Sequence, residues 1–199
     1  HLRLACTGCQ GDCPVHVDMA AYKSECLSHY YEKHARPRHA LAFGHIDRWA
    51  RLASIAPAAV NALTHAPGLS SLFKAIGGIA PARRTPSFAP RTFRAWFAAR
   101  KSRVDAARPE VVLWADTFND HFHPTTAQAA VEVLEHAGFR VKVPADGKLC
   151  CGRPLYDYGY LDEAERYLRR LVGALREDAA RGTPIVVLEP SCAAVFRDE

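Results

Sequence analysis

The sequence predicts an α/β protein in which a helical N-terminal region precedes a parallel, doubly wound sheet domain. In the second half, short apolar runs such as residues 111–114 alternate with long amphipathic segments, the pattern of buried strands joined by crossover helices. In the first half, apolar residues recur at helical spacing and are punctuated by proline and glycine. With 199 residues, 49% of them hydrophobic, the chain can bury a core in one or two domains.

The first half is expected to be helical. Asp18 is a good N-cap for the first helix, whose apolar face would hold Cys26 as a small buried hydrophobe. Pro37 is expected to start the second helix, and residues 80–90, which contain three prolines, predict a linker. The expected helices of this half span residues 19–34, 37–53, 58–64, 69–76 and 91–101.

Charge is distributed unevenly along the chain. Residues 1–108 hold 16 Lys and Arg against 6 Asp and Glu, whereas residues 109–199 hold 10 against 15. Scattered basic residues are typical of solvated helix faces, so we expect no nucleic-acid partner, but a peripheral contact with a membrane stays open. The sequence has no run of 18 or more apolar residues, so it predicts no membrane span. The helix at residues 91–101 has an aromatic side suited to docking on a neighbouring domain.

From residue 110 the pattern is that of an α/β domain. The expected strands span residues 111–114, 139–143 and 185–188, and the expected helices between them span residues 124–136 and 161–180. In a parallel sheet, the loops that follow the strands meet at one edge, where ligands bind. We therefore expect Cys150, Cys151 and Cys192 to meet there, with the sulfur of Cys192 within roughly 10 Å of the pair.

Three cysteines near the N-terminus have the spacing of an iron-sulfur loop. Cys6, Cys9 and Cys13 are followed by Pro14 and match the end of the run C-x2-C-x2-C-x3-C-P, but Arg3 stands where a fourth cysteine would precede them. Zinc sites usually pair two C-x2-C knuckles, and a thioredoxin-type pair follows a strand. An iron-sulfur site or its remnant is therefore the leading interpretation, with zinc or plain structural cysteine as the alternatives.

A second group of thiols stands at the expected sheet edge. Cys150 and Cys151 are adjacent and open a glycine turn, which suits metal ligation or thiol redox chemistry rather than a disulfide between them. Such spacings indicate reduced thiols, so we expect a reducing compartment, the cytoplasm or the inner face of its membrane. His121 and His123 stand near the same edge as candidate replacement ligands, but ordinary loop polarity, with His123 capping the next helix, is the favoured interpretation.

Taken together, these motifs resemble the iron-sulfur half of FAD-linked oxidoreductases of the glycolate and D-lactate dehydrogenase type, and their heterodisulfide-reductase-like relatives. The segments that carry the resemblance are residues 6–19, 21–23, 36–38, 49–51, 113–118, 150–155 and 188–192. The resemblance implies a 4Fe-4S ferredoxin-type module followed by a cysteine-rich CCG domain. Residues 1–34 would be a partial cluster module with its exit helix, residues 35–108 a helical region and linker, and residues 109–199 an incomplete CCG domain of a longer protein.

The resemblance also implies which residues bind metal. The implied iron-sulfur ligands are Cys6, Cys9, Cys13, Cys150, Cys151 and Cys192. Because Arg3 replaces one ligand, the first site would hold a 4Fe-4S cluster with another ligand, a 3Fe-4S core or no cluster. The CCG pattern expects a further cysteine within residues 115–119 and another beside Cys192, where Glu189 and Val195 stand, so three of five thiols remain.

By the same resemblance, the chain would be an electron-transfer segment of a flavin-dependent 2-hydroxyacid oxidoreductase. It would be part of an enzyme but would supply no catalytic acid or base. FAD would lie in another domain or a partner subunit, and a quinone or other acceptor would receive the electrons. Two alternatives remain open: a thiol or heterodisulfide redox site at Cys150 and Cys151, and a degenerate, metal-free interaction module.

Overall fold

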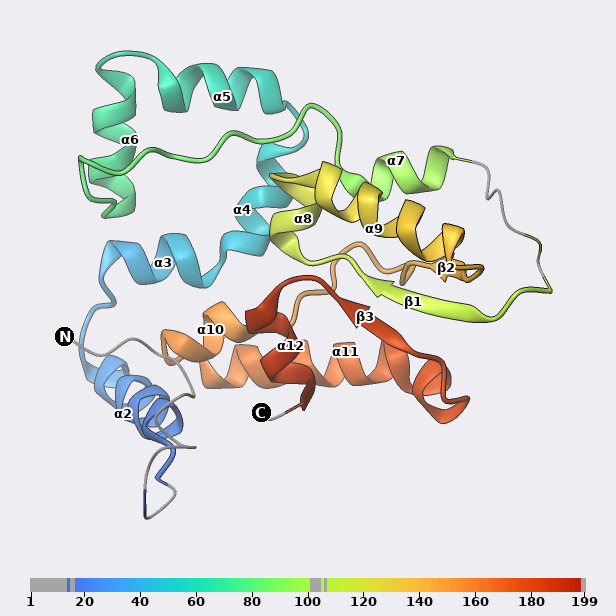
Figure 1. Ribbon diagram of the computed structural model, residues 1–199. Helices are drawn as coiled ribbons and strands as arrows, with labels where there is room; N and C mark the ends of the chain where they lie inside the picture. The colour runs from blue at the N-terminus through green and yellow to red at the C-terminus, as the bar shows by residue number, and fades with distance from the viewer. Residues whose placement is uncertain (1–13, 15–16, 101–104, 106, 198–199) are drawn as a thin grey trace.

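The computed structural model describes Pro14, residues 17–100, residue 105 and residues 107–197, and shows helices arranged around a small sheet (Figure 1). The helices of the first half are α2 (Met19–Lys33), α3 (Arg38–Gly44), α4 (Ile46–Ala53), α5 (Pro57–His65), α6 (Leu69–Gly77) and α7 (Phe93–Ala99). The second half contains β1 (Glu110–Trp114), α8 (Thr117–His121), α9 (Pro124–His136), β2 (Arg140–Lys142), α10 (Arg153–Asp157), α11 (Leu161–Ala180), β3 (Ile185–Val187) and α12 (Pro190–Arg197).

The sheet confirms the predicted parallel topology. Its three strands have the order β2-β1-β3, and β1 pairs in parallel with both neighbours. Strand β1 is central and covered on both faces, which is why its sequence is a continuous apolar run rather than an alternating one. The chain moves from β1 to one side and then crosses back to the other, so the strand order reverses between β1 and β3. Ligand sites of doubly wound sheets lie at this kind of switch point.

Each face of the sheet has its own core. Val111 and Leu113 point to the face covered by α7 and α9, where Phe93 is fully buried. Val112 and Trp114 point to the opposite face, which is covered by α10, α11 and α12. Helices on both faces confirm the doubly wound arrangement, and the buried aromatic side of α7 confirms that this helix docks on the sheet domain.

The second predicted helix is interrupted. The structure breaks residues 37–53 at His45 into α3 and α4. Gly44 ends α3 where the ring of Tyr160 lies so close that an added Cβ would come within 3.0 Å of its Cε2 atom. Glycine is a poor helix former, and here it permits both the close contact and the change of direction.

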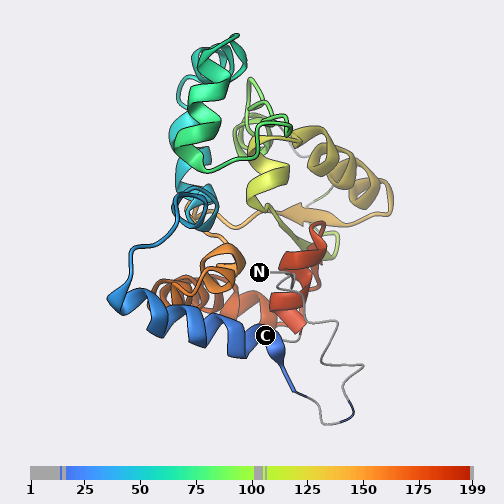
Figure 2. The ribbon, with the colours of Figure 1, turned by 90° about the vertical axis from the view of Figure 1, so that its left-hand side faces the viewer.

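The buried face of α2 differs from the expected one. Asp18 caps the helix as predicted, with its carboxylate accepting hydrogen bonds from the backbone N–H groups of Ala20 and Ala21. However, Cys26 is exposed, so its expected burial is wrong. The buried residues are the small ones, Ala20 and Ser24, because α2 packs closely against α10 and α11 (Figure 2).

Three short helices, α8, α10 and α12, were not predicted from the sequence. The helices α8 and α10 have five residues each, and α12 has eight, so none displays a long amphipathic repeat. Residues 80–90 form neither helix nor strand, as expected for a linker, and the side chain of Asn61 exchanges two hydrogen bonds with the backbone of Phe88. None of the helices in the described part of the chain is long and apolar enough to cross a membrane.

Candidate functional site

Three thiols meet at the predicted edge of the sheet. Cys150 and Cys151 lie in the segment between β2 and α10, and Cys192 lies in the first turn of α12, just after β3. All three are buried in the core cluster on the α11 face. The Sγ atom of Cys192 lies 3.1 Å from the Sγ atom of Cys151, so the predicted proximity is confirmed across 41 residues of sequence.

The turn after the cysteine pair requires glycine. Gly152 has φ +81°, a left-handed conformation that side chains disfavour, and it precedes the first residue of α10. An added Cβ would lie 3.3 Å from the Cβ atom of Tyr167 in α11. The glycine therefore lets the backbone turn sharply while Cys150 and Cys151 stay against α11.

The segment in which the CCG pattern expects another cysteine touches the pair. Asp116 is almost fully buried and caps α8 by accepting hydrogen bonds from the backbone N–H groups of Phe118 and Asn119. This cap places Thr117 at the start of the helix, where its hydroxyl donates to the Sγ atom of Cys150 at 3.8 Å. A hydroxyl thus occupies a position directly beside the thiols.

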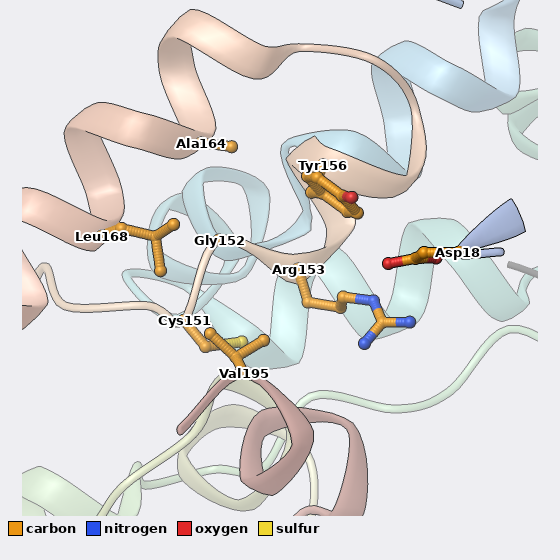
Figure 3. A pocket seen from close by; sticks show the side chains of 8 residues that line it. All are labelled: Asp18, Cys151, Gly152, Arg153, Tyr156, Ala164, Leu168 and Val195. Atoms are coloured by element: carbon orange, nitrogen blue, oxygen red, sulfur yellow. The ribbon is translucent and has the colours of Figure 1, made fainter. Parts of the chain in front are cut away.

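A pocket of about 260 Å³ opens beside Cys151 (Figure 3). Val195 lines this pocket and is buried, so the position three residues after Cys192 also belongs to the site. The side chain of Arg153 extends across the pocket toward Asp18, and its Nε atom donates to Asp157 at 3.0 Å. The site therefore joins the α/β half to the start of α2.

Hydrogen bonding and burial keep the thiols of Cys150 and Cys151 protonated. The hydrogen bond with Cys151, together with burial, raises the pKa of Cys150 well above its ordinary value. For Cys151, the hydrogen bond with Cys150 lowers the pKa, but the hydrogen bond with Cys192 and burial outweigh it and raise the pKa to about 12. A group that stabilises thiolates, such as a bound cation, is therefore needed before the sulfurs of Cys150 and Cys151 carry charge at neutral pH.

The two histidines near the edge are not brought into this site. His121 lies in α8 rather than in a loop, and it is buried with its Nδ1 atom 2.7 Å from the hydroxyl of Ser54, so its interpretation as loop polarity is wrong. His123 occupies the N-cap position of α9 but makes no side-chain capping hydrogen bond. Among the described residues, no group of three or more His, Cys, Asp or Glu side chains is arranged to hold a metal ion.

The N-terminal ligand candidates lie outside the described residues. This applies to Cys6, Cys9 and Cys13, and to Arg3. Their assignment as iron-sulfur ligands stays a prediction, as does that of Cys150, Cys151 and Cys192.

Three further residues at or beside the site were not among the candidate ligands. Trp114 belongs to the same buried cluster as the three thiols, and Thr117 and Val195 contact the site from α8 and α12. Thr117 and Val195 stand at or near positions where the CCG pattern expects cysteine, which is the signal that points to them. The sequence predicts Trp114 only as part of a buried strand.

Comparison with known proteins identifies the same region. Residues 115–197 match the family of the cysteine-rich domain named CCG. The chain is 34% identical over 89 residues to lactate utilization protein A of Bacillus velezensis, covering 45% of this chain and 35% of that protein. It is 27% identical over 141 residues to one subunit of the anaerobic glycerol-3-phosphate dehydrogenase of Escherichia coli K12, covering 70% of this chain and 35% of that relative.

A third relative aligns with almost the whole chain. D-2-hydroxyglutarate dehydrogenase of Pseudomonas putida is 26% identical over 205 aligned residues, covering 98% of this chain but only 20% of that enzyme. No solved structure matches the chain. The chain thus spans about a third of the length of the first two relatives and a fifth of the third. The expected resemblance to CCG modules of oxidoreductases is confirmed, and residues 115–197 match the cysteine-rich CCG domain family.

Proposed function

We propose that this chain is an electron-transfer segment of an oxidoreductase, in which the sheet edge and the N-terminal loop each hold an iron-sulfur cluster. The meeting of Cys150, Cys151 and Cys192 in one buried cluster at the switch point carries this proposal. Dehydrogenases among the relatives support a redox role. The electrons would come from FAD in another domain or subunit and pass to a quinone or other acceptor.

The three cysteines at the sheet edge supply the sulfur donors that an iron-sulfur group uses, but they are not by themselves arranged to hold a metal. Three soft sulfur donors lie together in a largely buried cluster, and cysteine sulfur is the usual ligand of such groups. Thr117 and Val195 stand where further thiols would complete the set. At least one more ligand must therefore come from beyond these three cysteines. The bound group would supply one-electron transfer, while the chain would orient its sulfur ligands and exclude solvent.

The N-terminal loop is proposed as the second site. Cys6, Cys9 and Cys13 would hold a 4Fe-4S cluster with an additional ligand or a 3Fe-4S core, because Arg3 replaces the fourth thiol of the run. Asp18 follows Cys13 by five residues and lines the pocket beside Cys151. This position supports the idea that the two sites exchange electrons. The name of the Pseudomonas putida relative favours a 2-hydroxy acid as the substrate of the complete enzyme.

A metal-free thiol site is the second candidate function. The separation of 3.1 Å between the sulfurs of Cys151 and Cys192 favours it, because two thiols in such contact can be oxidised together. The attacking species in thiol exchange is the thiolate, however, and the pKa of Cys151, raised to about 12, keeps this thiol protonated at neutral pH unless a bound cation stabilises the thiolate. Iron-sulfur ligation is therefore the better supported function.

The test is the iron and sulfide content of the full chain after anaerobic reconstitution with ferrous iron and sulfide. We expect Cys151→Ser to lower both by the content of one cluster. Cys26→Ser is the matched control, because Cys26 is exposed on α2 away from the thiol cluster, and it should leave both unchanged. Val195→Cys should raise the content or its lifetime in air, because it adds a thiol to the wall of the site.

The possible results separate the functions. If Cys151→Ser and Cys26→Ser both retain full iron and sulfide, the sheet-edge site does not bind a cluster. A reconstituted protein without iron that forms a Cys151–Cys192 disulfide on exposure to a small disulfide would favour the thiol site. Absence of both would leave the metal-free interaction module.

A further inference from the structure

Helix α6 presents its large apolar side chains to solvent. Ser70, Lys74 and Gly77 follow one another at helical spacing and are its half-buried residues. The large apolar side chains form a stripe on a different face, and each is 44–63% exposed: Leu69, Leu72, Phe73 and Ile76. A surface helix normally turns its apolar stripe toward the core. In α6 the side that packs on the protein carries polar or small residues instead, so the stripe is available to a partner.

The stripe lies at the edge of the molecule. Helix α6 packs mainly on α3 and α5, and Figures 1 and 2 both show α5 and α6 away from the sheet. The described residues therefore leave at least 44% of each side chain of the stripe exposed.

Basic side chains are held beside this stripe. Arg38 of α3 donates to a backbone oxygen in the last turn of α6 at 3.2 Å. Lys74 donates to the backbone oxygen of Pro81 at 3.1 Å, which holds the segment that leads to Arg83 and Arg84 against α6. Arg38, Arg83 and Arg84 are all exposed. These three arginines form the basic rim of the stripe.

The charge beside the stripe selects an anionic partner. Residues 52–99 contain five Lys and Arg and no Asp or Glu, and α3 contains no acid either. A second copy of this chain is disfavoured, because a two-fold contact through α6 would bring the two basic rims together. The stripe consists of hydrocarbon side chains, whereas protein–protein interfaces carry about one hydrogen bond per 100–200 Å². A lipid surface fits both the charge and the composition.

We propose that the apolar stripe of α6 docks on an anionic lipid surface, with Arg38, Arg83 and Arg84 contacting the lipid phosphates. The stripe lies in the plane of the interface, at the boundary between headgroups and acyl chains, as in other interfacial helices. The basic rim adds attraction to the negative surface potential. This surface is separate from the thiol cluster, so the inference does not depend on the proposed iron-sulfur function.

The first experiment measures binding of the full chain to phospholipid vesicles by co-sedimentation. We expect binding to equimolar phosphatidylcholine and phosphatidylglycerol that weakens at high salt, and much weaker binding to phosphatidylcholine alone. Arg83→Gln, Arg84→Gln should weaken binding roughly fivefold for each charge removed. Leu72→Gln, Phe73→Gln should weaken it by about tenfold or more, because polar amides replace the side chains that enter the lipid.

Each double variant has a matched control in the α/β half. Val133→Gln, Val172→Gln replaces two apolar side chains that are 67% and 54% exposed on α9 and α11. Arg166→Gln, Arg176→Gln removes the same charge from exposed positions of α11. Both controls should bind vesicles as the wild type does. All four variants change exposed side chains, so circular dichroism should show them folded.

The second experiment locates the contact on α6. Phe73→Trp in a Trp49→Phe background adds an indole to the stripe, and vesicles brominated along their acyl chains should quench its fluorescence. Val133→Trp in the same background is the control, and the same vesicles should leave its emission unchanged. Quenching at both positions, or at neither, would contradict insertion of the α6 stripe.

Three results of the vesicle experiment would overturn the inference. Binding that survives Leu72→Gln, Phe73→Gln places the contact elsewhere on the chain. A loss of binding in the arginine variant alone indicates attraction to any anionic surface, including that of an acidic protein. A concentration-dependent dimer that Leu72→Gln, Phe73→Gln abolishes identifies a second copy of the chain as the occupant.

Discussion

The α/β half and the helical region before it bury their apolar side chains very differently. In the α/β half, the apolar residues of β1 and the helices around it form two buried clusters, one on each face of the sheet. In the helical region, α6 has no buried residue, and its stripe of Leu69, Leu72, Phe73 and Ile76 is 44–63% exposed. The α/β half therefore contains its own hydrophobic core. The helical region buries less apolar surface, so its stability depends more on its contacts with the α/β half.

Charge separates the two regions in the same way. Residues 36–100 carry ten arginines and lysines and a single acidic residue, Asp47. This aspartate is 3% exposed, and its carboxylate accepts a hydrogen bond from the Tyr167 hydroxyl of α11 at 2.9 Å and pairs with Arg51 at 3.0 Å. The one acid of residues 36–100 is thus used at the contact with the α/β half.

Other polar contacts also join the two regions. Arg36 donates to the backbone oxygens of Tyr158 and Gly159 and lies over the ring of Tyr160. His121 of α8 and Ser54 of α4 form another link. A buried α/β core thus positions the thiols, while the basic helical region is joined to it by specific polar contacts.

The largest expected effect tests where the core lies. Leu175→Ala should lower the free energy of unfolding by about 3 kcal/mol, because Leu175 is 4% exposed between α11 and the sheet. Leu72→Ala makes the same change in α6, where the side chain is 58% exposed, and should cost less than about 0.5 kcal/mol. Denaturant unfolding of both variants measures this. Equal costs would show that the helical region buries Leu72 against a surface of its own.

An intermediate effect tests the fastening of the helical region. Asp47→Ala should cost about 2 kcal/mol, because it leaves the Tyr167 hydroxyl and Arg51 without their buried acceptor. The rate of amide hydrogen exchange should increase more in α4 than in β1, relative to the wild type. The control Glu165→Ala removes an exposed pair with Arg169 and should cost less than about 0.5 kcal/mol. Unchanged exchange in α4 would show that Asp47 does not hold the two regions together.

The smallest effect depends on pH. Burial lowers the pKa of His121 below its ordinary value of 6.5; Asp120 and Asp47 oppose this effect, and Arg51 and Arg94 add to it. Below pH 6.5 the unfolded state therefore binds more protons than the folded state, so stability should fall as pH drops, by at most about 1.4 kcal/mol per pH unit.

The matching variants identify the residue responsible. His121→Gln should remove this part of the pH dependence, whereas His29→Gln, at an exposed position of α2, should retain it. Unfolding measured between pH 5 and pH 7.5 provides the comparison. Identical slopes in the wild type and His121→Gln would assign the effect to other groups.

Much of the fold can be predicted because its elements have strong local signals. The continuous apolar run of β1 and the long amphipathic helix α11 predict these elements within about one residue of their observed bounds. Elements of five residues, such as α8 and α10, escape prediction, because so short a segment has no periodicity to read. The predicted buried face of α2 is wrong. Its aromatic residues form the clearer apolar stripe in the sequence, but the close contact with α10 has room only for the small residues Ala20 and Ser24.

The candidate site is predictable in part. Parallel strands carry their following loops to one edge, so the approach of Cys192 to Cys151 follows from strand direction alone. The unpaired indole N–H of the buried Trp114 does not follow, because nothing in the sequence shows whether an acceptor lies near it among the described residues. Whether a buried polar atom is paired depends on every neighbour around it.

By itself, the sequence determined the order and type of the main elements, the charge contrast between the two halves and the edge at which the thiols meet. These properties are encoded in local spacing and in the handedness of crossover connections. Only the tertiary structure decided that Asp47 reaches Tyr167 and that His121 is buried against Ser54. The physical reason is that side-chain burial and hydrogen bonding join segments 67 and 120 residues apart, and no pattern within one segment records its partner.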